Sequence, residues 1–354
     1  MPNPAEMLTG LQLQGAKSTW NVIQLIPKNQ QGSGGHFSTS YIVENAKGER
    51  AFLKAMDYAE AFNSPNPPAA LHMLTETYLF EKSVLDVCAV RNLSRVVRVL
   101  DEGQIDVAAA VAAPVRVVNF LVFELAIGNV SLQANMLQRL DTAMSLHILH
   151  SVAIGLQQLH GEGITHQDIR PSNILRFNAV IAKLADLGRA GSTGHAAPHD
   201  AILVPGFRPY APAEGLYRMD RGNRSLFDWR RCGDMFHFGS MIHFMFRGQM
   251  LMPQIRAKLQ DQHTPEKWTG TYDAVLPYIK SAFAEVIDDF VNDVTGAYAS
   301  EVTEALKQTG EPDPRLRGHP RNLGKNKDQY SFERFISLFD KLSAETAWRM
   351  RRQP

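Results

Sequence analysis

Two short segments in the middle of the chain carry the residues best suited to chemistry. Residues 166–173 read HQDIRPSN, and residues 186–188 read DLG. Phosphoryl transfer needs an aspartate that accepts the proton of a hydroxyl, together with oxygen ligands for Mg²⁺. Asp168 fits the first role, and Asn173 and Asp186 fit the second. Arg170 adds a positive charge that can neutralise the transferring group.

A lysine in an apolar strand is the next candidate. Lys54 lies within residues 51–56, AFLKAM, and a lysine in such surroundings needs an anionic partner. The helix expected next offers Glu76 and Glu81. At ~100° per residue these two point to different faces, and Glu81 shares its face with apolar residues. The pattern therefore favours Glu81 over Glu76 as the partner, with an ion pair of no further role as the alternative.

A glycine-rich turn lies between two expected strands. Small residues let backbone N–H groups approach phosphate oxygens without a side-chain clash, although an ordinary hairpin turn has the same composition. The spacing leaves the register open, with either Gly32 and Gly34 leading the motif or Phe37 at its tip. The candidate phosphate-binding residues are Gly32, Ser33, Gly34, Gly35, His36, Phe37 and Ser38.

Length and composition limit the class of protein. The 354 residues correspond to about two domains or one large bilobal one. The 37 basic and 36 acidic residues give a net charge of +1, which argues against a polybasic nucleic-acid binder. Only two cysteines, Cys88 and Cys232, exclude a disulfide framework and indicate a reducing compartment. With no export signal or apolar span visible, we expect a cytoplasmic protein without a membrane partner.

The elements that must position these residues change in character along the chain. The first third has strand patterns, and the part after Leu125 has helical periodicity, which predicts an α+β fold. The expected strands are 20–26, 41–44, 51–56, 96–100 and 117–123. The expected helices are 71–88, 141–160, 234–246, 272–294 and 332–342.

From about Trp20 to Leu342 these ordered motifs resemble the eukaryotic-type (Hanks-type) Ser/Thr protein kinases. The resemblance implies a bilobal protein kinase-like fold, with a β-rich N-lobe that holds one main helix and a mostly helical C-lobe. The expected division is an N-terminal extension at 1–19, the N-lobe at 20–124, the C-lobe at 125–342 and a basic C-terminal tail at 343–354.

The resemblance also implies roles for the residues above. Lys54 would hold the α- and β-phosphates of ATP and would be positioned by Glu81. Asp168 would be the catalytic base, with Asn173 and Asp186 as ligands of Mg²⁺. The glycine-rich turn would cover the phosphates.

A nucleotide-binding hinge is implied at residues 122–126, VFELA. The backbone of Glu124 and Ala126 would bind the adenine edge, and Phe123 would be the gatekeeper. Ser131, at the start of the next helix, would reach the ribose.

Four further residues resemble structural positions of the family. Residues 211–214 read APAE, one residue longer than the family's Ala-Pro-Glu. Glu214 would pair with Arg317, with Arg315 as the second candidate. Asp234 would hold the backbone of the loop around Asp168. His166 is expected to bond backbone near the metal-binding loop.

The chain also departs from the family pattern. Gln167 stands where many members have Arg, so the basic pocket for a phosphorylated activation loop is missing. We therefore expect activity that does not depend on phosphorylation of Ser192 or Thr193. Arg170 replaces the usual Lys and adds a rigid fork of donors. Phe207 occupies the place where Ser/Thr-directed members have Thr, which weakens any assignment of the acceptor residue.

The leading expectation is an ATP- and Mg²⁺-dependent protein kinase that acts on a protein hydroxyl, Ser or Thr, in a protein substrate that can include the chain itself. Neither a nucleic-acid nor a membrane partner is expected. A small-molecule phosphotransferase of the aminoglycoside or choline type is one alternative, against which stand the APAE stretch and the Asp234 motif. A nucleotide-binding pseudokinase is the other, although Lys54, Asp168 and Asp186 are all present.

Overall fold

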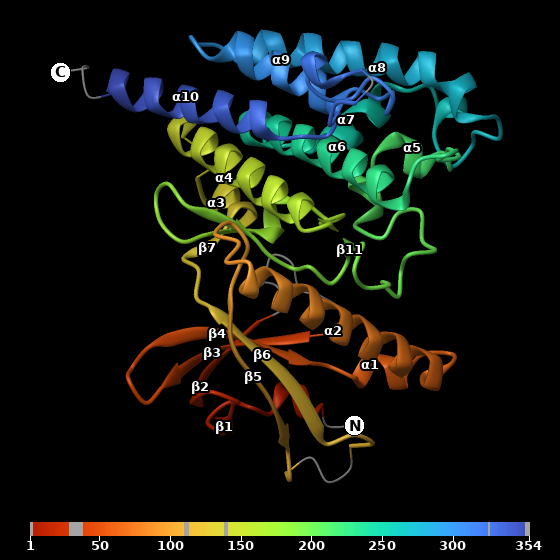
Figure 1. Cartoon of the computed structure of the whole chain (residues 1–354). Helices are drawn as coiled ribbons and strands as arrows, with labels where there is room; N and C mark the ends of the chain where they lie inside the picture. Colours follow the sequence, from red (N-terminus) through yellow and green to blue (C-terminus); the bar gives the residue numbers. More distant parts are fainter. Residues whose placement is uncertain (1–2, 28–37, 110–112, 138–140, 325, 351–354) are drawn as a thin grey trace.

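Six strands from the first third of the chain form one antiparallel sheet, shown in the lower half of Figure 1. The computed structural model describes residues 3–27, 38–109, 113–137, 141–324 and 326–350. Along the sheet the order is β1-β2-β3-β4-β6-β5. The strands are β1 Gln12–Gln14, β2 Thr19–Ile26, β3 Ser38–Asn45, β4 Arg50–Met56, β5 Val99–Asp106 and β6 Val117–Glu124.

The main helix of the smaller lobe is α2 (Pro67–Val90), which follows the short α1 (Ala59–Phe62). The α2 helix starts where Asn66 accepts a hydrogen bond from the backbone N–H of Ala69, with proline in the first turn. Its buried face carries Leu74, Phe80, Glu81, Val84, Leu85 and Cys88. A carboxylate within this apolar face must find a cationic partner.

The first residues of the chain belong to the sheet of the smaller lobe. Strand β1 pairs with β2, and the short 3-10 helix η1 (Pro4–Glu6) is fixed where the Tyr41 hydroxyl donates to the carbonyl of Ala5, 2.6 Å away. Leu8 is fully buried in the core beneath the sheet. Residues 3–19 of the expected extension therefore pack as part of the N-lobe, because their apolar side chains complete the N-lobe core.

The larger lobe is mostly helical, as expected (Figure 1). Its helices are α3 Val130–Leu137, α4 Thr142–Gly161, α5 Ala213–Leu216, α6 Leu226–Arg247, α7 Leu251–Lys258, α8 Tyr272–Asp293, α9 Ala299–Gly310 and α10 Glu333–Met350. Its short strands are β7 Gly128–Asn129, β8 Ile164–Thr165, β9 Ile174–Arg176, β10 Ala182–Leu184 and β11 Gly191–Ser192. Short 3-10 turns are η3 Pro171–Asn173, η4 Arg208–Tyr210, η5 Asp261–His263 and η6 Pro320–Asn322.

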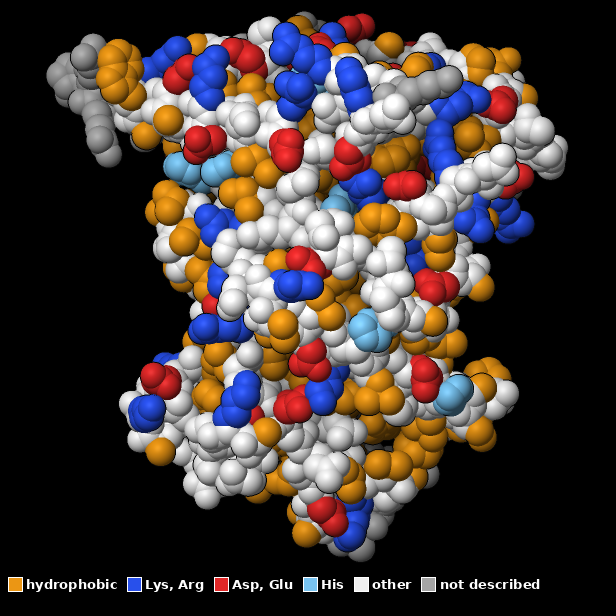
Figure 2. Space-filling view, viewed as in Figure 1, with side chains coloured by type: hydrophobic (Ala, Val, Ile, Leu, Met, Phe, Trp, Pro, Cys, Tyr) orange, Lys and Arg blue, Asp and Glu red, His pale blue; other side chains and the backbone are white. Residues whose placement is uncertain are grey.

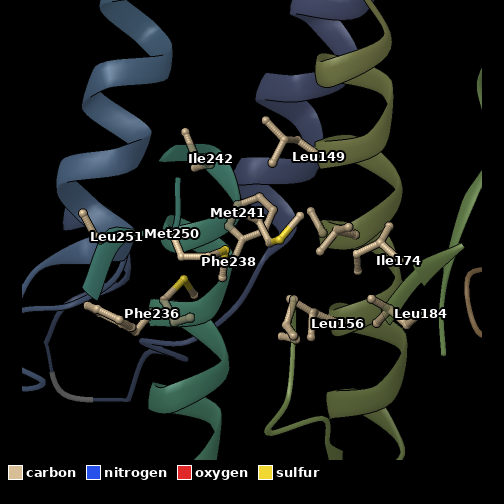
Figure 3. Packing of buried hydrophobic residues seen from close by; sticks show 14 of the residues in the cluster. Leu149, Leu156, Ile174, Leu184, Phe236, Phe238, Met241, Ile242, Met250 and Leu251 are labelled. Atoms are coloured by element: carbon tan, nitrogen blue, oxygen red, sulfur yellow. The ribbon is translucent and has the colours of Figure 1, made fainter. Parts of the chain in front are cut away.

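Helix α6 runs through the centre of the larger lobe. Phe238 and Met241 of α6 pack toward Leu149 and Leu156 of α4 in the close view of Figure 3. The helix is buried on nearly every side, as its apolar sequence predicts. It begins earlier than expected, because Ser225 accepts a hydrogen bond from the Asp228 backbone N–H and caps it.

Two expected element boundaries are wrong. Residues 96–97 do not start a strand of the sheet, because the Val97 N–H donates to the Leu184 carbonyl in the other lobe at 2.8 Å. Strand β5 begins at Val99 instead. Helix α10 continues to Met350, so the expected tail boundary at residue 343 falls inside a helix.

Both cysteines are free and buried, Cys88 on α2 and Cys232 on α6. Within the described ranges, no helix combines the length and apolar character needed to cross a membrane.

Candidate active site

A cleft of about 240 Å³ lies between the sheet and the helical lobe, at the waist visible in Figure 2. Its walls are mainly apolar, with Lys54, Glu81, Glu124 and Asp186 as the charged groups. Such a combination of apolar walls and a few polar groups is typical of a small-molecule site. The other lining residues are Ile26, Ser38, Ser40, Ile42, Phe52, Val97, Phe123, Leu125, Ala126, Gly128, Asn129, Leu132, Leu175 and Ala185.

Lys54 joins elements from both lobes. Its Nζ lies 3.0 Å from each carboxylate oxygen of Glu81 and 3.6 Å from Oδ1 of Asp186. Burial opposes the charged form of Lys54, but Glu81 and Asp186 outweigh it and raise the pKa of Lys54 above its ordinary value. Glu76, the other sequence candidate, is exposed on the outer side of α2.

Asp168 is held by three different groups. The Asn173 amide donates to its carbonyl at 2.8 Å and to its Oδ2 at 3.0 Å. The Phe207 N–H donates to Oδ1 at 2.8 Å, and Arg170 Nε lies 3.2 Å from Oδ2. One neutral donor on each oxygen and the nearby guanidinium charge fix the orientation of this carboxylate.

Asp234 fastens the backbone of the same loop to α6. Its carboxylate accepts from the backbone N–H groups of His166 and Gln167, each at 2.8 Å, and from His160 Nε2 at 2.9 Å. Burial raises the pKa of Asp234, but the hydrogen bond from His160 and the other donors lower it overall. Gln167 has a φ of 66°, a strained conformation that these bonds maintain.

Asp186 follows β10 and also has a left-handed φ, 64°. Burial raises its pKa, but the charge of Lys54 outweighs that effect and lowers the pKa of Asp186 overall. The neighbouring Ala185 N–H donates to the Asn173 carbonyl at 2.9 Å, and the Ala185 carbonyl lies 3.1 Å from His166 Nε2. Two hydrogen bonds to the backbone of Ala185 thus connect the Asp168 loop to the cleft.

The oxygens of Asn173 and Asp186 are the hard ligands that Mg²⁺ prefers. Among the residues that the structure describes, no three His, Cys, Asp or Glu side chains form a metal cluster. A Mg²⁺ site with one oxygen each from Asn173 and Asp186, completed by phosphate and water, would need no cluster of three such side chains.

The hinge candidates lie along the cleft, but one ribose candidate does not. Phe123, Glu124 and Ala126 line the cleft, and the Glu124 side chain is tied to Lys183 Nζ at 2.6 Å. Ser131 is not a lining residue; Asn129 and Leu132 are. Ser131 is the second residue of α3, and the side chain of Asn129, just before this helix, accepts from the Leu132 N–H at 2.8 Å.

Most of the glycine-rich turn falls outside the described residues. This applies to Gly32, Ser33, Gly34, Gly35, His36 and Phe37. Ser38, the last of the candidates, starts β3, is buried and lines the cleft.

Glu214 and Arg317 form a buried ion pair across 103 positions of sequence. Arg317 Nη1 and Nη2 lie 2.5 and 2.9 Å from the two Glu214 oxygens. The second candidate, Arg315, pairs with Asp313 and Asp273 instead. Two parallel charged hydrogen bonds hold α5 against the later part of the lobe.

The sequence reasoning missed the apolar walls of the cleft. Ile26, Ile42 and Phe52 come from three neighbouring strands, and Leu175 follows Asn173 by two positions. The alternation of side chains along a strand predicts which residues share one face of the sheet. The sequence does not show which of the two faces meets the other lobe.

Comparisons with known proteins agree with this geometry. Residues 27–323 match the sequence family described as "Protein kinase domain". G protein-coupled receptor kinase 2 of Caenorhabditis elegans is 28% identical over 127 residues, 36% of this chain and 16% of the relative. Serine/threonine-protein kinase TOS3 of Saccharomyces cerevisiae is 39% identical over 64 residues, 17% of this chain and 11% of the relative.

MAP kinase-activated protein kinase 2 of Homo sapiens is 29% identical over 105 residues, 28% of this chain and 24% of the relative. This chain thus spans less than a third of the length of each of these relatives.

Proposed function

Because the chain belongs to the protein kinase family, we propose that it transfers the γ-phosphoryl group of ATP to a hydroxyl of a protein substrate. The observation that carries the proposal is the contact of Lys54 with both Glu81 and Asp186 in the cleft between the lobes. A phosphate-binding cation and a metal-binding carboxylate are the two charges that this reaction needs side by side.

The nucleotide would lie in the cleft, with its adenine against the apolar walls and the hinge backbone of Glu124 and Ala126. Lys54, held by Glu81, would bind the α- and β-phosphates. Mg²⁺, bound by Asn173 and Asp186, would neutralise charge on the phosphates. The protein contributes mainly position and charge, as phosphoryl transfer requires.

Asp168 would accept the proton of the acceptor hydroxyl. The hydrogen bonds from Asn173 and Phe207 support this role, because they hold the carboxylate in one orientation. Arg170, 3.2 Å from Asp168, would neutralise charge on the transferring group. We propose Ser or Thr as the acceptor.

The segment before α5 supports a protein as the substrate. Residues 203–207, 211–212 and 214–215 line a small pocket with Gln167, the residue before Asp168. Glu214, paired with Arg317, anchors this segment to the lobe. An anchored surface segment beside the catalytic loop suits a peptide better than a small molecule.

Labelled ATP, Mg²⁺ and a generic protein substrate test the proposal. We expect Asp168→Asn to lower the transfer rate by about 10²–10⁴-fold while nucleotide still raises the melting temperature. Lys54→Ala should weaken both binding and transfer. Glu76→Gln, on the exposed side of α2, is the matched control. Full turnover by Asp168→Asn would contradict the role of Asp168, and binding without transfer by the wild type would favour a pseudokinase.

A further inference from the structure

An arginine that the proposed chemistry does not use is buried beside the catalytic loop. Arg230 of α6 has only 4% of its surface exposed. Its Nη1 donates to Oδ1 of Asp200 at 2.6 Å, and its Nη2 donates to the His199 carbonyl at 3.3 Å. Both partners lie in the activation segment, defined here as residues 187–213, which runs between α2 and α6 in Figure 1.

Asp200 closes a tight turn that begins at Ala197. Its Oδ2 accepts from the Ala197 N–H at 2.8 Å, and its own N–H donates to the Ala197 carbonyl at 3.0 Å. One carboxylate therefore holds both the turn and the buried guanidinium. A buried arginine without its anion would be costly, so this pair constrains the segment strongly.

The same arginine contacts the catalytic loop through its backbone. The Gln167 amide donates to the Arg230 carbonyl at 2.8 Å and lies 3.2 Å from Oδ1 of Asp234. Gly191 of β11 passes so close that an added Cβ would lie 2.5 Å from Nη1 of Arg230. Arg230 therefore lies where the activation segment, α6 and the loop of Asp168 meet.

The turn also reaches α2. The His199 ring donates from Nε2 to the Ala190 carbonyl at 2.7 Å and meets the Phe80 ring edge-on, with centroids 5.7 Å apart. Phe80 precedes Glu81, which holds Lys54. A shift of the turn would therefore disturb both the loop and the helix that position the charged groups of the cleft.

We infer that the Asp200–Arg230 ion pair positions the activation segment for transfer, so that activity needs no phosphate on that segment. The inference rests on the proposed kinase function and concerns its regulation. Asp200 supplies a permanent negative charge that the segment would otherwise need from a phosphate group. Asp200 and Arg230 are positioning residues, since neither lines the cleft.

The test compares transfer rates of phosphatase-treated proteins. Asp200→Asn keeps the side-chain shape but removes the charge, and should lower kcat at least tenfold while the dissociation constant for ATP stays within twofold. Asp200→Glu should restore most of the rate, which a purely structural defect would not allow. Asp293→Asn is the matched control, because it breaks the Arg247–Asp293 ion pair at the other end of α6.

The combined Ser192→Ala and Thr193→Ala variant should keep the wild-type rate.

A wild-type rate in Asp200→Asn would overturn the inference, as would loss of transfer on phosphatase treatment of the wild type. If Asp200→Asn fails to fold, Asp200→Glu alone decides, and a tenfold loss there with an intact melting temperature also overturns it. Binding of ATP by the wild type without transfer, whatever its phosphorylation, would instead contradict the proposed function.

Discussion

At the scale of single residues, Lys54 brings together the charges of the two lobes. Residue type and helix phase predict its contact with Glu81, since a strand lysine among apolar neighbours needs an anion. The contact with Asp186 appears only in the structure. Ser131, expected to reach the ribose, is not among the residues that line the cleft, whereas its neighbours Asn129 and Leu132 are.

Glu81→Gln tests the contribution of this ion pair. The variant leaves Lys54 with Asp186 as its charged partner and removes the charge-assisted hydrogen bonds at 3.0 Å. Loss of such a bond costs about 1.5–3 kcal/mol, so transfer should fall by at least about tenfold. Steady-state rates with Glu76→Gln as control provide the measurement. Equal rates in the two variants would show that Glu81 does not position Lys54.

His243 should make the fold sensitive to acid. It is buried in α6, its Nδ1 donates to the Gln249 carbonyl at 2.6 Å, and burial lowers its pKa from 6.5 to about 4. Below pH 6.5 the unfolded chain therefore binds the proton and the folded chain does not, so the free energy of unfolding falls as pH drops toward 4. The loss at pH 5 should be about 2 kcal/mol.

Urea unfolding of His243→Asn between pH 7 and 5 checks this expectation. Asparagine keeps a donor near the position of Nδ1 but does not titrate, so the variant should lose that part of the pH dependence. His72→Asn, at an exposed position of α2, is the control. An unchanged pH dependence in His243→Asn would contradict the assignment.

At the scale of elements, the periodicity of apolar residues and the local composition predict the long helices and most of the strands. They do not predict the strand β1 near the start of the chain, because β1 has only three residues and is defined by its pairing with β2. They also misplaced β5, since Val97 bonds to Leu184 of the other lobe, a contact that no local pattern reports.

The N-terminal segment should therefore stabilise the smaller lobe. Leu8 is fully buried in the core beneath the sheet, so Leu8→Ala should lower the free energy of unfolding by about 2–5 kcal/mol. Met73→Ala, at a half-exposed position of α2, should change it by less than about 1 kcal/mol. Denaturant titration gives both values, and similar losses in the two would argue against a structural role for residues 1–19.

At the scale of the whole molecule, the family resemblance gave the two lobes and the order of the motifs. It could not give the anchor of the activation segment, because Arg230 and Asp200 belong to none of the motifs that carried the resemblance. Their contact depends on the path of the loop after β11, which the sequence alone does not fix.

The Glu214–Arg317 pair should be a major contributor to the stability of the larger lobe. Arg317→Met leaves the Glu214 carboxylate buried without its partner and should cost about 3–5 kcal/mol. Arg315→Met, which breaks a half-exposed pair with Asp313, should cost less than about 1 kcal/mol. Thermal unfolding distinguishes them, and equal melting temperatures would show that the buried pair does not hold the lobe together.

The two thiols offer a way to follow the detachment of α2 and the exposure of α6 separately. Burial raises the pKa of Cys88 to about 12 and that of Cys232 to about 11, so neither forms the reactive thiolate while its helix stays packed in the core. An alkylating reagent would then mark Cys88 only when α2 detaches and Cys232 only when α6 is exposed. Peptide mapping after a pulse of such a reagent would time both events in the unmodified protein, and would show which one nucleotide delays.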